Sequence, residues 1–184
     1  MPNCCDGPKC LESRIHTFWK ESDLTRFAAR IKGDWWQQII PHPTLYVSHV
    51  VIEADPISGQ IGMSAKAYDA DGNVAATWHS EAAVLIGNKL FYIWSGRYTD
   101  KKRSAEQRTG FGSFNFRGEG EAKFGQGEFL DVDRVLQKLE TSKWSLAEFK
   151  RCEADESAVL NSHDTERIRE LIQKKKTTTL SGGC

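Results

Sequence analysis

The sequence predicts a mainly β protein, an eight-stranded antiparallel up-and-down barrel preceded by a short N-terminal helix and followed by a C-terminal helix. Three observations lead to this fold. After Gly33 the apolar residues follow the two-residue period of strands, and turn-forming residues interrupt them about every ten positions. The short connections favour hairpins between successive strands. Closure into a barrel removes the exposed edges of such a sheet, and eight strands enclose packed side chains or one small ligand.

The first expected element is a helix that begins near Ser22 and ends before Gly33. In SDLTRFAARIKG the apolar residues recur at helical spacing, Ser22 is a suitable N-cap, and Gly33 suits the C-terminal stop. This helix delivers the chain to Trp35 at the start of the first strand. The expected strands lie near residues 33–40, 45–54, 60–69, 73–86, 88–98, 111–117, 123–131 and 142–150.

The breaks between these strands have chemical causes. PHPT removes backbone donors, DPISG and DADGN are turn sequences, and GNK makes a tight hairpin between two of the longest strands. The charged stretch TDKKRSAEQRTG after Tyr98 is expected to be a loop that covers one mouth of the barrel. Alternation within KLFYIWSGRY separates a face with Phe91 and Ile93 from a face with Tyr92 and Trp94, and it does not decide which face lines the lumen.

The chain turns polar after Arg151, where a C-terminal helix is expected. The segment SHDTERIRELIQKKK places Ile168, Leu171 and Ile172 on one side, behind residues that can cap a helix. We expect this helix to dock outside the barrel. The predicted organisation is a Cys-rich N-terminal extension over residues 1–21, a barrel domain with its leading helix over 22–150, a helical segment over 151–176 and a disordered tail over 177–184.

The composition argues against several classes of protein. The 25 Lys and Arg residues balance 25 Asp and Glu residues, so no net field favours a nucleic-acid polymer or an anionic membrane. No apolar run approaches the roughly 18 residues of a membrane span. The N-terminus lacks the apolar centre of a secretory signal. We therefore expect a soluble, cytoplasmic protein without a membrane span, and its oligomeric state is left open.

The cysteines predict neither a disulfide framework nor a metal site. Five cysteines are an odd number, which leaves at least one unpaired in a monomer. Cys4, Cys5 and Cys10 lie near His16, but their spacing is not one of the usual zinc-binding arrangements. We expect a reduced N-terminal extension and no metal or cofactor. The roles of these cysteines and of Cys184 stay open.

Gly33, Asp34 and Trp35 form a Gly-x-Trp motif between the short helix and the first strand. In this motif and in the order of the elements around it, the chain resembles the lipocalin and fatty-acid-binding superfamily, the calycins, whose barrels begin with a Gly-x-Trp motif. The likeness covers Gly33 to Lys150. It implies that Gly33 and Trp35 are structural residues and that Trp35 closes the base of the barrel.

The second half of the barrel carries a further resemblance. The segments LFYIWSGRYTDKKR, GFGSFNF, GQGEFLD and KWSLAEFKR look like the β-barrel sensors of bacterial anti-phage signalling. In that family an eight-stranded barrel binds a cyclic nucleotide made by a partner nucleotidyltransferase. The resemblance implies a soluble sensor of a cyclic oligonucleotide. Those sensors usually carry N-terminal membrane helices, and because this sequence departs from them there, an action by membrane disruption is not implied.

Arginine and aromatic residues gather around the fifth and sixth expected strands. Guanidinium groups match phosphate oxygens, and aromatic rings stack on bases, so this segment is the candidate site for a phosphorylated aromatic ligand. The expected ligand-binding residues are Tyr92, Trp94, Arg97, Tyr98, Arg108 and Phe114. The alternative is that the aromatic residues form the core and that the loop arginines are solvated.

Two other functions stay open. His79 and Glu81 share one face of an expected strand and could supply an acid–base pair or a haem ligand inside a barrel. A cyclase or isomerase that uses the lumen as its reaction chamber for a hydrophobic metabolite needs titratable groups as well. The candidates for this role are Glu53, His49, His79, Glu81 and Glu128. Because no motif of a known catalytic class appears, no catalytic residue is assigned and binding is favoured over turnover.

Overall fold

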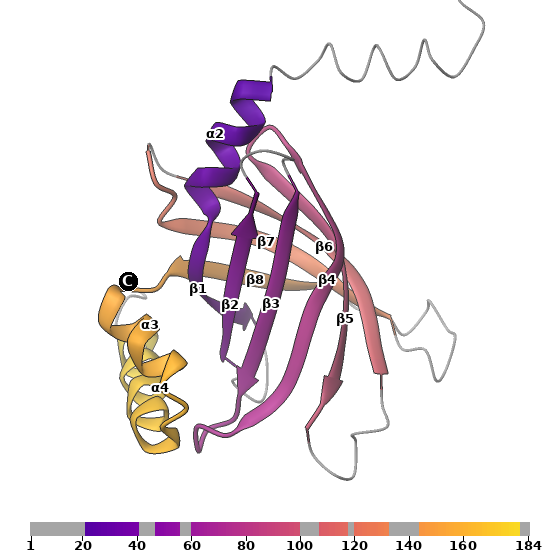
Figure 1. The fold of residues 1–184 in the computed structure, drawn as a ribbon. Coiled ribbons are helices and arrows are strands. Elements are labelled where there is room, and N and C mark those ends of the chain that lie inside the picture. The colour runs from indigo at the N-terminus through magenta and orange to yellow at the C-terminus, as the bar shows by residue number, and fades with distance from the viewer. Residues whose placement is uncertain are drawn as a thin grey trace, which may run out of the picture.

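Eight antiparallel strands close into one barrel in the computed structural model (Figure 1). The structure describes residues 21–40, 47–55, 60–99, 107–117, 120–132 and 144–180. The strands are β1 Gly33–Ile40, β2 Val47–Ala54, β3 Ile61–Tyr68, β4 Val74–Ile86, β5 Lys89–Tyr98, β6 Gln107–Arg117, β7 Phe124–Val132 and β8 Trp144–Arg151. Each strand pairs with the next in sequence, and β1 pairs with β8. The predicted up-and-down barrel is confirmed.

The helices are α2 Glu21–Ile31 before the barrel and α3 Ala154–Asn161 and α4 Thr165–Leu180 after it. The sequence predicts one C-terminal helix, and the structure has two. The short α3 carries no apolar stripe, and its start is marked by a bond from the Glu153 backbone N–H to the Glu156 carboxylate at 3.0 Å. The predicted helical segment ends at residue 176, and α4 runs to Leu180. Residues 181–184 lie outside the described part.

Strand β6 begins earlier than predicted. Its first residues belong to the segment expected to be a loop, yet they continue the hairpin with β5, with Gln107 opposite Arg97 and Arg108 opposite Gly96. Charged composition suggested a loop, whereas a ladder needs only backbone partners on the neighbouring strand. The extension places Arg108 on a strand of the barrel. The expected cover over one mouth falls on residues 100–106, which lie outside the described residues.

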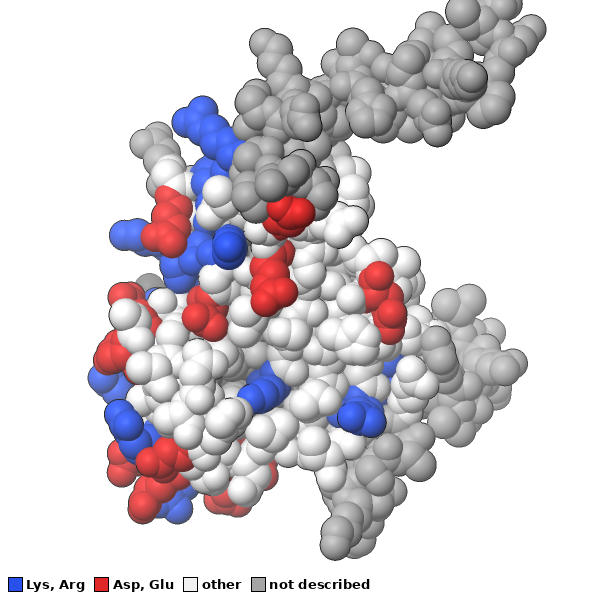
Figure 2. Space-filling model, viewed as in Figure 1, with Lys and Arg blue, Asp and Glu red and all other residues white. Residues whose placement is uncertain are grey.

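The two C-terminal helices lie along the outside of the barrel, beside β1, β2 and β3 (Figure 1). They cover Trp36, Val47 and Tyr68, which pack against Leu160 and Ile168. On the face shown in Figure 2, charged side chains gather over these helices and around α2, while the middle of the face is largely uncharged. None of the helices in the described part of the chain combines the length and the apolar character needed to cross a membrane.

Glu156 joins these helices to the barrel. Its Oε2 accepts a hydrogen bond from Trp36 Nε1 at 3.0 Å, and its Oε1 forms an ion pair with Lys175 Nζ. Burial alone would raise the pKa of this carboxyl, but the hydrogen bonds from Lys175, the Glu153 backbone and Trp36 outweigh burial. The pKa of Glu156 is therefore lowered, and the folded protein favours its charged form.

Acid should destabilise the wild-type protein more than the Glu156→Gln variant. Because the pKa of Glu156 is lowered by folding, its contribution is complete above the ordinary Glu pKa of about 4.3 and is lost as the pH falls through the folded-state value. Urea unfolding between about pH 6 and pH 3 should show the larger loss of unfolding free energy in the wild type. Equal losses in the two proteins would contradict this role.

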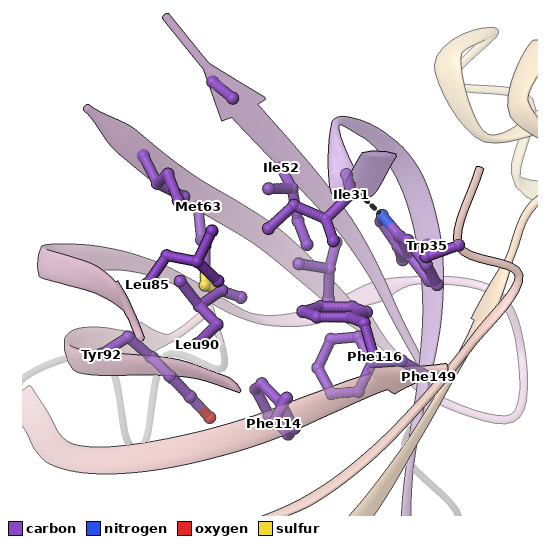
Figure 3. Close-up of a cluster of buried hydrophobic side chains, with 14 of the residues drawn as sticks. Ile31, Trp35, Ile52, Met63, Leu85, Leu90, Tyr92, Phe114, Phe116 and Phe149 are labelled. Carbon is purple, nitrogen blue, oxygen red and sulfur yellow. Dashed lines mark hydrogen bonds between the residues drawn. The ribbon is translucent and has the colours of Figure 1, made fainter. Parts of the chain in front are cut away.

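Trp35 lies at the closed end of the barrel. Its side chain has no exposed surface, its Nε1 donates to the carbonyl oxygen of Ile31 at 2.7 Å, and its ring centroid lies 5.0 Å from that of Phe116. Figure 3 shows Trp35 beside Phe116 and Phe149 inside the barrel. Ala28 and Ile31 bring α2 into the same cluster. The helix and the tryptophan together close this end.

Arg151 covers Trp35 at the end of β8. Its guanidinium carbon lies 4.6 Å from the centre of the Trp35 ring, within the range of a cation–π contact. Its nitrogens donate to the carbonyl oxygens of Arg30, Lys32 and Ala122, each at 2.7 Å. Gly33 adopts a φ of +126°, and a Cβ there would lie 2.6 Å from Arg151 Nη1. The Gly-x-Trp segment therefore leaves room for an arginine that ties α2, the segment before β7 and β8 together.

Aromatic rings lie over glycines of the neighbouring strand inside the barrel. A Cβ on Gly112 would come within 2.5 Å of the Tyr92 side chain, and a Cβ on Gly127 would come within 2.5 Å of the Phe114 ring. Each glycine thus provides the space that the ring of its neighbour fills. This packing explains why GFGSFNF and GQGEFLD combine glycine with aromatic residues.

Candidate functional site

A cavity of about 340 Å³ occupies the lumen at the end away from Trp35. Each of the eight strands supplies at least one lining residue. The cavity lies at the end of the barrel where β1, β3, β5 and β7 end and where β2, β4, β6 and β8 begin. Its lining residues come mainly from these parts of the strands. Trp35 lies at the start of β1 and belongs to the opposite half. The barrel is therefore packed at one end and hollow at the other.

Aromatic side chains form one wall of the cavity. The rings of Trp78 and Tyr92 stack with centroids 6.2 Å apart, and Trp94 meets Phe129 edge to face at 6.4 Å. Tyr92 also stacks on Phe114, which lies deeper in the barrel, at 5.0 Å. Burial raises the pKa of the Tyr92 phenol. At neutral pH this phenol is a hydrogen-bond donor or acceptor and not a base.

Charged side chains stand at the mouth of the cavity. Arg108 Nη1 lies 3.6 Å from Asp131 Oδ2, and its guanidinium carbon lies 6.0 Å from the centre of the Tyr98 ring. Arg97 is exposed at the rim. The described lining residues include two arginines and one carboxylate, so the charged groups at the mouth carry a net positive charge. This excess of positive charge occurs in a chain whose total charge is zero.

Polar groups also lie on the wall that β1, β2 and β8 contribute. Gln37 and Ser48 are buried, with only 4% and 3% of their surface exposed, and both line the cavity together with Ser145. An amide and two hydroxyl groups in such positions can orient a ligand by hydrogen bonds. The cavity is therefore amphipathic, with an aromatic wall, a polar wall and a basic rim.

The structure brings most of the expected site residues together. Tyr92, Trp94, Tyr98 and Arg108 line the cavity with Arg97 at its rim. The structure also shows which face of β5 lines the lumen, a question that sequence alternation left undecided. Phe91 and Ile93 point outward, and the residues on the lumen side are Leu90, Tyr92, Trp94 and Tyr98.

Phe114 differs from its expected role as a stacking surface. It is fully buried in the packed half, where it stacks on Tyr92 and packs at a tilt against Phe149, whose ring centroid lies 3.9 Å away. Phe114 shares the lumen face of β6 with Arg108, but three side-chain repeats of about 6.6 Å each separate them along the strand. Phe114 therefore supports the aromatic wall from behind.

Sequence reasoning missed several lining residues, because they come from strands outside the arginine-rich segment. Trp78, Phe129 and Asp131 lie on β4 and β7, and Gln37 and Ser48 lie on β1 and β2. The alternation in VAATWHSEAAVLI puts Trp78 on the same face as Ala76, and that signal could have identified Trp78. Nothing in the local sequence of Gln37 or Ser48 distinguishes them from outward-facing polar residues.

His79 and Glu81 lie on the outer face of the barrel. Trp78 points into the lumen, so the next residue, His79, points away from it and is 60% exposed. Glu81 Oε1 lies 3.2 Å from His79 Nε2 and accepts a hydrogen bond from Ser95 Oγ. A haem in the lumen could not be reached by His79 from this position.

The remaining titratable candidates for a lumen enzyme are also absent from the cavity lining. His49 is buried outside the lumen, where Nε2 lies 2.7 Å from Asp34 Oδ1, and Glu53 and Glu128 are exposed. The acid–base groups that the sequence offered for a cyclase or isomerase therefore do not meet in the described part of the cavity.

The candidate thiol ligands Cys4, Cys5 and Cys10, together with His16 and Cys184, lie outside the described residues. Cys152 is described and follows β8. Its backbone N–H donates to the Asp34 carbonyl oxygen at 2.9 Å, and burial raises the pKa of its thiol. The Cys152 thiol is therefore protonated at neutral pH and a poor nucleophile.

No protein-family model, curated protein or solved structure matches this chain. The eight-stranded barrel is consistent with a lipocalin-like architecture.

Proposed function

We propose that this barrel binds an anionic small molecule with a flat apolar body in the open half of its lumen. The observation that carries the proposal is the position of Arg108 at the mouth of a 340 Å³ cavity that has an aromatic wall. Small-molecule sites are concave, mostly apolar and equipped with a few convergent polar groups. The hollow end of this barrel has these properties, and its packed end gives the site a rigid base.

The charges at the mouth favour an anion. A guanidinium presents paired donors that match carboxylate or phosphate oxygens, and Arg108 retains part of its exposure beside Asp131. The Asp131 carboxylate pairs with Arg108, and Arg97 adds a second guanidinium at the rim. An anionic ligand would therefore meet the Arg108 guanidinium, which Asp131 orients, and the Arg97 guanidinium at the rim.

The aromatic wall favours a flat ligand body. Trp78 and Trp94 offer ring surfaces from two adjacent strands, and stacking of a base on an aromatic side chain contributes about 1–3 kcal/mol. Gln37 and Ser48 offer hydrogen bonds on the opposite wall. A heteroaromatic ring with polar edges would use both walls at once.

In its most specific form the proposal is that the chain is a sensor of a cyclic oligonucleotide, as its resemblance to the β-barrel sensors of anti-phage signalling implies. Bases would stack on Trp94 and Trp78, beside the buried Tyr92, and phosphates would meet Arg108 and Arg97. The cavity volume of 340 Å³ is near the lower end of the roughly 300–1,000 Å³ typical of small-molecule sites. A cyclic dinucleotide would therefore extend from the lumen into the mouth, where Arg97 stands.

Thermal-shift screening followed by product analysis tests this function. The panel contains cyclic di- and trinucleotides, haem, and apolar metabolites with and without a carboxylate. Ligand that binds only the folded state raises the unfolding temperature, by an amount that grows with its concentration relative to Kd. We expect stabilisation by anionic aromatic compounds that are recovered unchanged. Stabilisation by neutral apolar compounds alone, or conversion of the ligand to a product, would contradict the proposal.

Arg108→Ala should weaken binding of the stabilising cyclic nucleotide by roughly 10- to 100-fold, since a hydrogen bond to a charged group contributes about 1.5–3 kcal/mol. Arg97→Ala should weaken binding less, because Arg97 is exposed at the rim. Isothermal titration calorimetry measures both affinities, and thermal unfolding checks that each variant is folded. If either variant lost stability while keeping the wild-type affinity, that arginine would belong to the structure and not to the ligand site.

A further inference from the structure

The outer surface of β4, β5, β6 and β8 exposes a set of large apolar side chains. We call this set, with Leu130 of β7, the outer apolar face. Its exposed members have between 37% and 55% of their surface accessible. They are Val84, Ile86, Phe91, Ile93, Phe111, Trp144 and Leu146.

Strand register makes this face continuous. Ile93 stands opposite Phe111, Phe111 opposite Leu130, and Leu130 opposite Trp144, so one apolar row crosses four adjacent strands. The rings of Phe111 and Trp144 meet edge to face with centroids 5.5 Å apart. Leu130 is 6% exposed because these neighbours cover it. The side chains therefore form one patch and not scattered exposed residues.

The opposite side of the barrel shows how such residues are normally accommodated. There α3 and α4 cover Trp36, Val47 and Tyr68 on the outer surface of β1 to β3. In Figure 1 both C-terminal helices lie away from β5 and β6, and α2 stands at the closed end of the barrel. Among the described elements no helix covers the outer apolar face.

The size of the face suits an interface between two proteins. The three aromatic side chains offer roughly 150–250 Å² each in full, and together with the four aliphatic ones, all about half exposed, they present an area on the order of several hundred Å². The largest apolar patch on a typical monomer is about 300–600 Å², and a standard interface buries about 800 Å² on each partner. Polar residues at the margin of the face would supply the remaining area.

The charges around the face suit a second copy of the same chain. The chain has no net charge, so two copies do not repel each other over long distances. Lys89 lies on β5, with Nζ 5.0 Å from the centre of the Phe91 ring, and the exposed Glu128 lies on β7. Both flank β6, two residues apart along it, because Lys89 stands opposite Asn115 on one side and Glu128 stands opposite Ser113 on the other. A two-fold axis that runs along β6 and brings it against β6 of another copy would place the β5 side of each copy over the β7 side of the other, with Lys89 near Glu128.

From these observations we propose that the outer apolar face is the interface of a symmetric homodimer, with β6 at its centre. A C2 interface uses the same patch on both subunits, as a self-complementary row of apolar side chains with one basic and one acidic flank allows. The dimer forms through the outside of the barrel. Its formation therefore does not depend on the ligand proposed for the lumen.

Sedimentation velocity of the full chain at micromolar concentration tests the dimer. The wild type should sediment with twice the chain mass of 20.8 kDa. Ile93→Lys and Phe111→Glu should each raise the dimer dissociation constant about tenfold or more, as changes at the centre of an interface do. The matched control is Ser64→Lys, an exposed residue on the outside of β3, which should leave the dimer unchanged. Circular dichroism and thermal unfolding check that each variant is folded.

Charge reversal tests the symmetry of the dimer without adding a charge to its apolar centre. Lys89→Glu and Glu128→Lys should each weaken association, and the double variant should restore it. A monomeric wild type would overturn the proposal, and so would a dimer that both apolar-face variants leave intact. A monomer that binds phospholipid vesicles through this face would also overturn it. A double variant no tighter than the single ones would overturn the β6-to-β6 arrangement.

Discussion

Trp35→Ala should destabilise the protein by about 3–5 kcal/mol, the usual result of truncating a buried tryptophan. The variant would lose the packing of the indole against Phe116, the hydrogen bond from Nε1 to Ile31 and the ring that lies beneath the Arg151 guanidinium. It would also leave a cavity where α2 meets the barrel. Urea unfolding measured by circular dichroism gives the change in free energy.

Trp35→Phe is the matched control. It keeps an aromatic ring in contact with Phe116 and Arg151 and removes the Nε1 hydrogen bond, so its loss of stability should be clearly smaller than that of Trp35→Ala. If Trp35→Ala left the unfolding midpoint almost unchanged, the closed end would not depend on Trp35. The Gly-x-Trp motif would then have no structural role.

Gly127→Val should destabilise the barrel by about 3 kcal/mol or more, because overpacking a filled site costs about 1–3 kcal/mol and this substitution also strikes the backbone. A Cβ at residue 127 would lie 1.9 Å from the carbonyl oxygen of Ser113 and 2.5 Å from the Phe114 ring. Neither group can move without breaking the pairing of β6 with β7 or the stack of Phe114 on Tyr92.

Gly62→Val is the control for this prediction. Gly62 also lies in a strand, β3, but a Cβ there meets no heavy atom within 4 Å. Its replacement should therefore change the stability by less than about 1 kcal/mol, as is usual for surface positions. Thermal unfolding of the two variants measures the difference. Equal effects at the two glycines would show that ring packing over Gly127 is not what requires a glycine.

The course of the strands could be predicted from the sequence because it depends on local chemistry. Turn sequences such as DADGN and GNK end strands wherever they occur, and the two-residue period holds along each strand. The start of β6 was harder to predict. Its residues Gln107 and Arg108 are polar, but they pair with β5 through backbone groups, and this pairing does not depend on the side chain. The helix α3 was not expected as a separate element because it carries no apolar stripe.

The candidate site could be predicted only in part. Tyr92, Trp94 and Arg108 were found because they lie in one hairpin that is rich in arginine and aromatic residues. Trp78 and Asp131 come from other strands, and only barrel closure shows that they share a cavity with that hairpin. The depth of a side chain also depends on register around the whole barrel. Local alternation therefore identifies a face but does not separate packed residues from lining residues.

Arg151 illustrates a further limit. Arg151 donates to the carbonyl groups of Arg30, Lys32 and Ala122, and its guanidinium covers the ring of Trp35. No short window of the sequence contains these partners. The Gly-x-Trp resemblance predicted Trp35 as a structural residue. The arginine that covers it can be identified only in the fold, where the first and last strands pair.

Filling the cavity tests the central claim, that the open half of the lumen is the ligand site, most directly. Ala67 lines the cavity on β3, and Ala67→Phe adds a ring to a space of 340 Å³, whereas Ser64→Phe puts the same ring on the exposed outer face of that strand. Isothermal titration calorimetry compares both variants with the wild type, using the cyclic nucleotide that stabilises the wild type most. The account predicts that Ala67→Phe remains folded and loses binding, while Ser64→Phe binds like the wild type. Undiminished binding by a folded Ala67→Phe variant would contradict it and place the ligand outside the barrel.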